Sequence, residues 1–117
     1  MHELGLVFHI IKAVGETAEE NGVSKVSRVT VQIGEVSGVI PEYLIDCWNW
    51  AVKREGRVMN EAKLLWEPLP AVTHCDNCGE NYPTVEYAKI CPHCGSDKTW
   101  LLTGNEFSIK EIEVPDE

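Results

Sequence analysis

Basic residues are scarce in this sequence. Its 117 residues include ten Lys and Arg against 19 Asp and Glu, which gives a formal net charge of −9 at pH 7. Proteins that bind nucleic acids use clustered Lys and Arg to contact phosphates, so this balance argues against a DNA- or RNA-binding protein. It fits a protein that handles cations or that binds a partner with a basic surface.

Long apolar runs are also absent. No run approaches the roughly 18 residues that a membrane span needs, and no basic segment precedes an apolar run at the start, as it would in a signal peptide. We therefore expect a cytoplasmic protein that does not bind membranes. In that compartment reduced cysteines can hold a metal.

Four of the five cysteines form two C-x2-C pairs, Cys75–Cys78 and Cys91–Cys94, with twelve residues between them. Gly79 and Gly95 follow the pairs directly and let the chain curl so that backbone N–H groups can point at the sulfurs. Four thiolates select Zn²⁺, with iron as the other common occupant, although this spacing is slightly shorter than usual. Two disulfides suit such pairs less well. The predicted zinc ligands are Cys75, Cys78, Cys91 and Cys94.

A four-thiolate shell leaves no open coordination position, and the sequence shows no nucleophile paired with a base. We therefore expect a binding protein and not an enzyme. The fifth cysteine, Cys47, lies near an apolar helix face and is expected to pack there.

Apolar periodicity predicts helices at about 3–20 and 41–54, and strands at about 25–36, 62–67 and 106–114. This order predicts an α+β fold with two helices on one face of a three-stranded antiparallel sheet and a four-cysteine zinc-ribbon module inserted before the last strand. The expected domains are 1–70 with 104–117, and the zinc-binding segment 71–103.

Few large apolar side chains are available to cover the metal in the inserted segment. The main ones are Tyr82, Tyr87, Ile90 and Trp100. They are too few for an independent core, so we expect the metal to supply much of the folding free energy there.

The N-terminus, Met1-His2-Glu3, can form a chelate. The α-amine of Met1, the deprotonated amide nitrogen of His2 and the His2 imidazole would give three nitrogens in one plane, which Ni²⁺ and Cu²⁺ prefer. Zn²⁺ does not readily deprotonate an amide, so this geometry discriminates against it. A fourth position could come from the Glu3 amide or carboxylate, or from water. A solvated His at a frayed end is the plainer interpretation of His2.

The Met-His-Glu start, the two Cys pairs, the segment Val31-Gln-Ile-Gly-Glu35 and the segment Gly104-Asn-Glu106 together resemble the HypA/HybF family of nickel metallochaperones. The resemblance covers the whole chain. It implies an α/β nickel domain with an inserted zinc ribbon, Ni²⁺ as transient cargo bound by Met1, His2 and Glu3, and Zn²⁺ as a structural ion on the four cysteines.

The resemblance also implies partners. Family members deliver nickel for [NiFe]-hydrogenase maturation with a GTPase of the HypB type, act on the hydrogenase large-subunit precursor, and in some organisms also support urease through its accessory proteins. The sequence fits either a monomer or a homodimer.

Three histidines remain outside these sites. His74 precedes the first Cys pair and His93 lies inside the second, so they could hydrogen-bond to the zinc ligands or exchange with them; solvated neighbours are the plainer interpretation. His9 is expected to be structural. The alternatives to a metallochaperone are a rubredoxin-like iron electron carrier, which would leave the N-terminal triad unexplained, and a zinc-ribbon interaction module.

Overall fold

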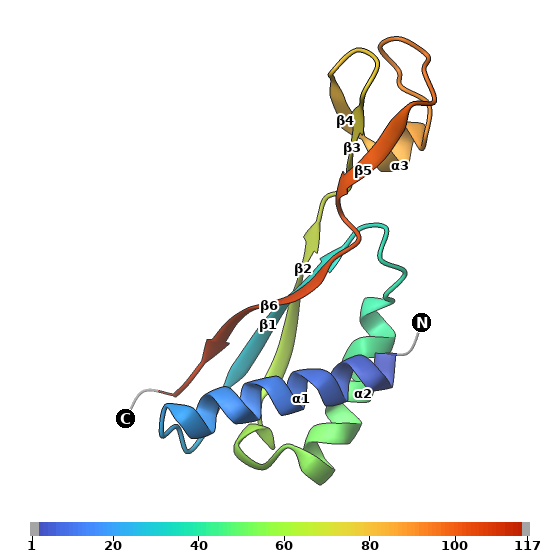
Figure 1. The fold of residues 1–117 in the computed structure, drawn as a ribbon. Coiled ribbons are helices and arrows are strands. Elements are labelled where there is room, and N and C mark those ends of the chain that lie inside the picture. The colour runs from blue at the N-terminus through green and yellow to red at the C-terminus, as the bar shows by residue number, and fades with distance from the viewer. Residues whose placement is uncertain (1–2, 116–117) are drawn as a thin grey trace. The chain divides into compact units, whose positions relative to one another are not determined.

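The computed structural model describes residues 3–115, which form two compact units (Figure 1). Within the described range, unit 1 comprises 3–32, 39–67 and 108–115, and unit 2 comprises 33–38 and 68–107. The elements, in chain order, are α1 Glu3–Glu20, β1 Arg28–Gly34, α2 Pro41–Glu55, η1 Arg57–Met59, β2 Lys63–Leu69, β3 Val72–Cys75, β4 Asn81–Pro83, α3 Thr84–Tyr87, β5 Thr99–Thr103 and β6 Phe107–Glu113. Among residues 3–115 there is no helix long and apolar enough to cross a bilayer.

Helix α1 begins and ends at the residues that the sequence predicts. Its buried apolar side chains recur every three or four residues: Val7, Ile10, Val14 and Ala18. The helix ends in a Schellman motif, because the N–H of Val23 donates to the carbonyl of Ala18 and the N–H of Gly22 donates to Glu19. Gly22 has a φ of 65°, which glycine adopts without strain.

Helix α2 packs beside α1 on one face of the first sheet (Figure 1). Its buried face consists of Leu44, Trp48, Ala51 and Val52. Trp48 is fully buried, and its indole N–H donates to the carbonyl of Ala62 at 2.9 Å, so the largest core side chain has no unpaired donor. The facing strand β1 contributes Val29, Val31 and Ile33, in the predicted alternation.

The first sheet has the strand order β2-β1-β6. The N–H of Ser27 donates to Glu113, and the N–H of Gly34 donates to Glu106, so β6 runs antiparallel to β1. β2 runs parallel to β1 (Figure 1), since Lys63 pairs with Ser27 at one end and Leu69 with Glu35 at the other. The expected fully antiparallel sheet is therefore wrong in this detail. Helix α2 carries the chain back before β2 begins, and such a crossover makes the two strands parallel.

Unit 2 contains a second antiparallel sheet, of order β4-β3-β5, which the sequence analysis did not anticipate. Three backbone segments of this unit, around Gly34, Ala71 and Gly104, approach one another closely. A Cβ built on Gly34 would lie 2.2 Å from the carbonyl oxygen of Gly104, and one on Gly104 would lie 2.3 Å from the Cα of Ala71. Only glycine allows these distances. The carboxylate of Glu35 accepts the Ala71 N–H at 2.8 Å, and Glu106 accepts the N–H groups of Gly104 and Asn105.

Candidate metal centre

The four cysteines of the two pairs come together in unit 2. Their sulfur atoms all lie within 4.8 Å of one another, and no other described residue joins the cluster. The Sγ atoms of Cys75 and Cys94 are 3.7 Å apart, as are those of Cys78 and Cys91. Sulfurs in a tetrahedron at a metal–sulfur distance of about 2.3 Å lie about 3.8 Å from one another. The cluster therefore fits one tetrahedral metal ion, and the chain contains a four-cysteine metal-binding site.

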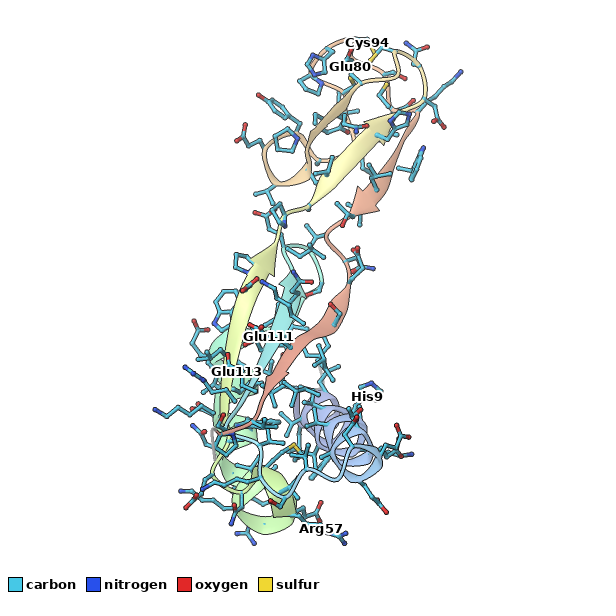
Figure 2. The ribbon with its side chains drawn as sticks, turned by 90° about the vertical axis from the view of Figure 1, so that its left-hand side faces the viewer. His9, Arg57, Glu80, Cys94, Glu111 and Glu113 are labelled. Atoms are coloured by element: carbon cyan, nitrogen blue, oxygen red, sulfur yellow. The ribbon has the colours of Figure 1, made fainter. Side chains whose placement is uncertain are left out.

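The two cysteine loops have the same backbone structure. In the first loop, the N–H of Gly79 donates to the carbonyl of Cys75, and the N–H of Cys75 donates to Glu80. In the second, Gly95 and Ser96 take the corresponding places around Cys91, at nearly equal distances. Gly79 and Gly95 have φ angles of 79° and 74°, which confirms the expected turn. Figure 2 shows Cys94 and Glu80 close together at the end of unit 2 that these loops form.

The ionisation of the sulfurs is unequal. The amide of Asn77 donates to Cys94 at 3.5 Å and, with the N–H of Ser96, lowers the pKa of the Cys94 thiol to about 6. The N–H of Glu80 also favours the Cys78 thiolate, but lost solvation and hydrogen bonds to the other three sulfurs outweigh it and raise the pKa of Cys78 to about 12. Four thiolates this close repel one another, so all four ionise together only around a cation. The sequence analysis did not predict this hydrogen bond, although Asn77 lies between Cys75 and Cys78, where its side-chain amide could have been expected to donate to a sulfur.

Apolar cover over the sulfurs is thin. Tyr82 is buried with Cys75 and Cys91, and its hydroxyl donates to the carbonyl of Ala88. The other three residues available for cover are half exposed: Tyr87 at 44%, Ile90 at 52% and Trp100 at 49%. Tyr87 ends helix α3, and Trp100 lies on the edge strand β5. These exposures agree with the expectation that the apolar side chains here are too few for an independent core.

Neither histidine near the pairs belongs to the sulfur cluster. His74 lies on the sheet, with its Nδ1 2.6 Å from the side-chain oxygen of Asn81. The centroids of its ring and of the Trp100 ring are 5.5 Å apart. The indole N–H of Trp100 donates in turn to Asp76. His93 is exposed. A role for either histidine in metal exchange stays a prediction.

The predicted nickel site lies at the edge of the described chain. Met1 and His2 fall outside the described residues. Glu3 is the first residue of α1 and is only 8% exposed. Its Oε2 accepts the N–H of Ile40 at 3.2 Å. Ile40 is the N-cap of α2 and its side chain caps no N–H group; Glu3 instead accepts the N–H of Ile40 itself and places a negative charge at that helix end.

Two further predictions concern single residues. Cys47 is a free, half-buried thiol on α2, compatible with the expected packing role. His9 is exposed on α1 (Figure 2). The sequence did not predict the contact between Glu3 and Ile40, because the two residues are 37 positions apart and no local sequence pattern indicates that they meet.

Comparison with known proteins agrees with this architecture. The family model described as "Hydrogenase/urease nickel incorporation, metallochaperone, hypA" matches residues 1–114. A hydrogenase maturation factor HypA from Dehalococcoides mccartyi is 33% identical over 117 residues, covering 100% of this chain and 97% of the relative. One from Shewanella halifaxensis is 36% identical over 114 residues, covering 97% of each chain.

A solved structure has the same fold. The solution structure of the nickel metallochaperone HypA from Helicobacter pylori matches with a TM-score of 0.74 and 25% identity, over 100% of both chains. The family model, the curated relatives and this structure all cover nearly the whole chain, including both cysteine pairs. The chain therefore belongs to the HypA family of hydrogenase-maturation nickel metallochaperones, and as a metallochaperone it is a binding protein and not an enzyme.

Proposed function

We propose that this protein binds Ni²⁺ at its N-terminus and delivers it for the maturation of [NiFe]-hydrogenase, while the four cysteines hold a structural Zn²⁺. The observation that carries the proposal is the closed sulfur cluster, whose members lie within 4.8 Å of one another. A closed four-thiolate shell suits a resident ion. The cargo then needs a different and more open site, and the start of the chain offers one.

Zn²⁺ is the ion that best fits the cysteine site. Four sulfurs, a tetrahedral arrangement and reduced thiols favour it, and iron is the alternative with the same geometry. Zn²⁺ would lower the pKa values of all four thiols and replace their mutual repulsion with four metal–sulfur bonds. Elemental analysis of the purified protein distinguishes the two ions: one zinc per chain supports the proposal, and one iron with a red colour points to an electron carrier.

The nickel ligands in this proposal are the Met1 amine, the His2 amide and imidazole, and Glu3. The positive end of the α1 dipole favours negative charge near its first residues, and so favours a deprotonated amide there. Because the Glu3 carboxylate already accepts the Ile40 N–H, the Glu3 backbone nitrogen is the better fourth ligand. The carboxylate then positions the start of α1 without leaving its own partner.

The family places the chain within the hydrogenase-maturation machinery. We infer that its direct partners are a GTPase of the HypB type and the precursor of the hydrogenase large subunit, in the cytoplasm, where thiols stay reduced. Delivery to urease through an accessory protein is part of the same proposal, since the matching family model names both enzymes.

The test is a calorimetric nickel titration of zinc-loaded protein with its native N-terminus. It is repeated with His2→Ala and with a short N-terminal extension that removes the free amine. His9→Ala is the matched control, because it removes an exposed histidine from the same helix. Glu3→Gln distinguishes the two candidate nickel ligands of that residue, the backbone nitrogen and the carboxylate. It removes the carboxylate charge, but the amide oxygen can still accept the Ile40 N–H.

We expect His2→Ala and the extension to lose the tight nickel site, with zinc content unchanged, and His9→Ala to keep it. Glu3→Gln should retain affinity within a few-fold if only the backbone nitrogen binds. Equal nickel binding by the wild type, His2→Ala and the extended protein would refute the terminal chelate.

A further inference from the structure

Unit 1 contains a groove that the proposed nickel and zinc sites do not use. It lies between α1 and the segment that links α2 to β2, and has a volume of about 790 Å³. Its apolar lining includes Ile11, Gly15, Val58 and the almost fully buried Met59. A Cβ on Gly15 would make an ordinary contact of 3.8 Å with the Met59 methyl group, so the backbone of α1 lies close to Met59 here. This volume suits several side chains of a bound peptide.

Basic residues border the groove on the side of α2 and η1. Arg54 lies with its guanidinium 4.6 Å from the centroid of the Trp50 ring, which holds the side chain in place. Arg57 projects from η1 at the helical end of unit 1 (Figure 2). Among the Lys and Arg side chains of residues 3–115, only Lys25, Arg28 and Lys110 form ion pairs with carboxylates, so Arg54 and Arg57 share an unpaired charge with most other basic side chains of this range.

The backbone of Arg57 is strained. Its φ is 51°, a left-handed conformation that costs roughly 1–2 kcal/mol for a residue with a Cβ and that glycine adopts freely. Arg54 has a local explanation, because a cation in the last turn of α2 favours the helix dipole. Arg57 lies two residues beyond the end of α2, in η1, so the same dipole effect reaches its side chain but does not require a left-handed backbone there. Such strain at an exposed arginine motivates a search for a ligand of its side chain.

Acidic residues on the same groove limit what can bind. The groove is lined by three acidic residues, Glu16, Glu19 and Glu55, and by three basic ones, Lys12, Arg54 and Arg57, so its net charge gives a densely acidic ligand no advantage. An apolar segment with one or two carboxylates satisfies both conditions. Its apolar side chains would cover the floor, and its carboxylates would pair with Arg54 and Arg57.

We propose that this groove is a docking site for an apolar peptide segment of a partner protein that carries one or two carboxylates. Ile11 is the groove residue nearest to Glu3 along α1, and eight residues of helix correspond to about 12 Å. A partner held here would leave the start of the chain free. Docking and metal transfer would then use different surfaces of unit 1.

The test uses a fluorescein-labelled, leucine-rich peptide of ten residues with two glutamates, and a counterpart with lysines in their place. Binding to zinc-loaded, nickel-free protein is measured by fluorescence anisotropy. Arg57→Gly is the main variant, because it removes the guanidinium and relieves the backbone strain. Lys53→Gln is the matched control, since it also removes one positive charge from the end of α2 but does not line the groove.

We expect the glutamate peptide to bind at least about tenfold more tightly than the lysine peptide, and Arg57→Gly to weaken that binding about tenfold. Lys53→Gln should change it less than about twofold, as expected for a charge outside the contact. The melting temperature of Arg57→Gly should be equal to or higher than that of the wild type, which shows that lost binding is not lost folding. Its nickel affinity should be unchanged, so this test is independent of the proposed function.

Three results would overturn the proposal. Equal affinity for both peptides, or no binding at about 1 mM, a concentration at which weak contacts are still detected, would exclude carboxylate recognition. Unchanged binding by Arg57→Gly would place the peptide elsewhere. A dimer in sedimentation experiments that Arg57→Gly dissociates would assign the groove to a second copy of the chain.

Discussion

Replacing Gly104 by alanine should destabilise the protein more than any other Gly→Ala change outside the cysteine loops. Gly104 has a φ of 111°, outside the left-handed region that other residues occasionally visit. That strain costs about 1–3 kcal/mol. The new Cβ would also lie 2.3 Å from the Cα of Ala71, a backbone atom that cannot rotate away. Overpacking of this kind adds about 1–3 kcal/mol, for a total of about 2–6 kcal/mol.

Two further variants separate the two causes. Gly22 has a positive φ of 65°, and a Cβ built there would meet no atom within 4 Å. Gly22→Ala should therefore lower the free energy of unfolding by only about 1–2 kcal/mol. Gly34→Ala lacks a positive φ but would place a Cβ 2.2 Å from the Gly104 carbonyl oxygen, so it should cost about 1–3 kcal/mol. Gly15→Ala, in mid-helix with only an ordinary contact, should stabilise the protein by about 0.5–1 kcal/mol.

The assay is urea unfolding of zinc-loaded protein, followed by far-UV circular dichroism and by the indole N–H resonance of Trp100, which reports on unit 2. With an m value of about 1–2 kcal/mol per molar, a loss near 4 kcal/mol lowers the midpoint by about 2–4 M. A Gly104→Ala midpoint no lower than that of Gly22→Ala would refute the reasoning, because it would mean that the backbone moves apart at little cost.

Two other predictions concern metal and pH. Removing the metal with a chelator should unfold residues 71–103 while α1 and α2 stay folded. The dispersed Trp100 and Tyr82 resonances should then disappear, and the helical circular dichroism should persist. Loss of both signals together would contradict this prediction. The hydroxyl of Thr103 and the N–H groups of Gly104 and Asn105 lower the pKa of Glu106. Its carboxylate therefore stabilises the fold above about pH 4.3, the value in an unfolded chain, and this contribution disappears as the pH falls through the lower folded pKa. The difference in urea midpoint between wild type and Glu106→Gln should thus be largest near pH 7 and shrink in acid, and a difference independent of pH would contradict it.

Local signals in the sequence predicted α1, α2 and the cysteine cluster well, but not the short helices η1 and α3. The end of α1 depends on Asn21 and Gly22, next to the last periodic apolar residue, and the Schellman hydrogen bonds form there. The cysteine loops are equally local, because each pair and its following glycine fit within a single turn. Such features depend only on residues that are neighbours in the sequence, so they can be predicted from the sequence alone.

Features that depend on distant residues were not predictable in the same way. The parallel direction of β2 follows from the path of α2, and the alternation of Leu64 and Trp66 does not encode it. Strands β3, β4 and β5 have three to five residues each, too few to show a period. The carboxylates of Glu3, Glu35 and Glu106 bind backbone N–H groups, and a sequence does not distinguish such acids from solvated ones.

The packing of unit 2 indicates that the fold of residues 71–103 depends on the metal that the four cysteines bind. The buried cluster around the sulfurs consists of Cys75, Cys91 and Tyr82. Most other large apolar side chains of residues 71–103 are exposed. So small a core cannot offset the conformational entropy of about forty ordered residues, at about 1–2 kcal/mol of backbone each. The metal–sulfur bonds must supply the difference, and losing the ion means unfolding the module. In the proposed terminal chelate, Glu3 is the one ligand within the described residues, and its carboxylate already accepts the Ile40 N–H. The proposal therefore predicts that loss of the cysteine-bound metal unfolds residues 71–103, whereas release of nickel leaves the fold intact.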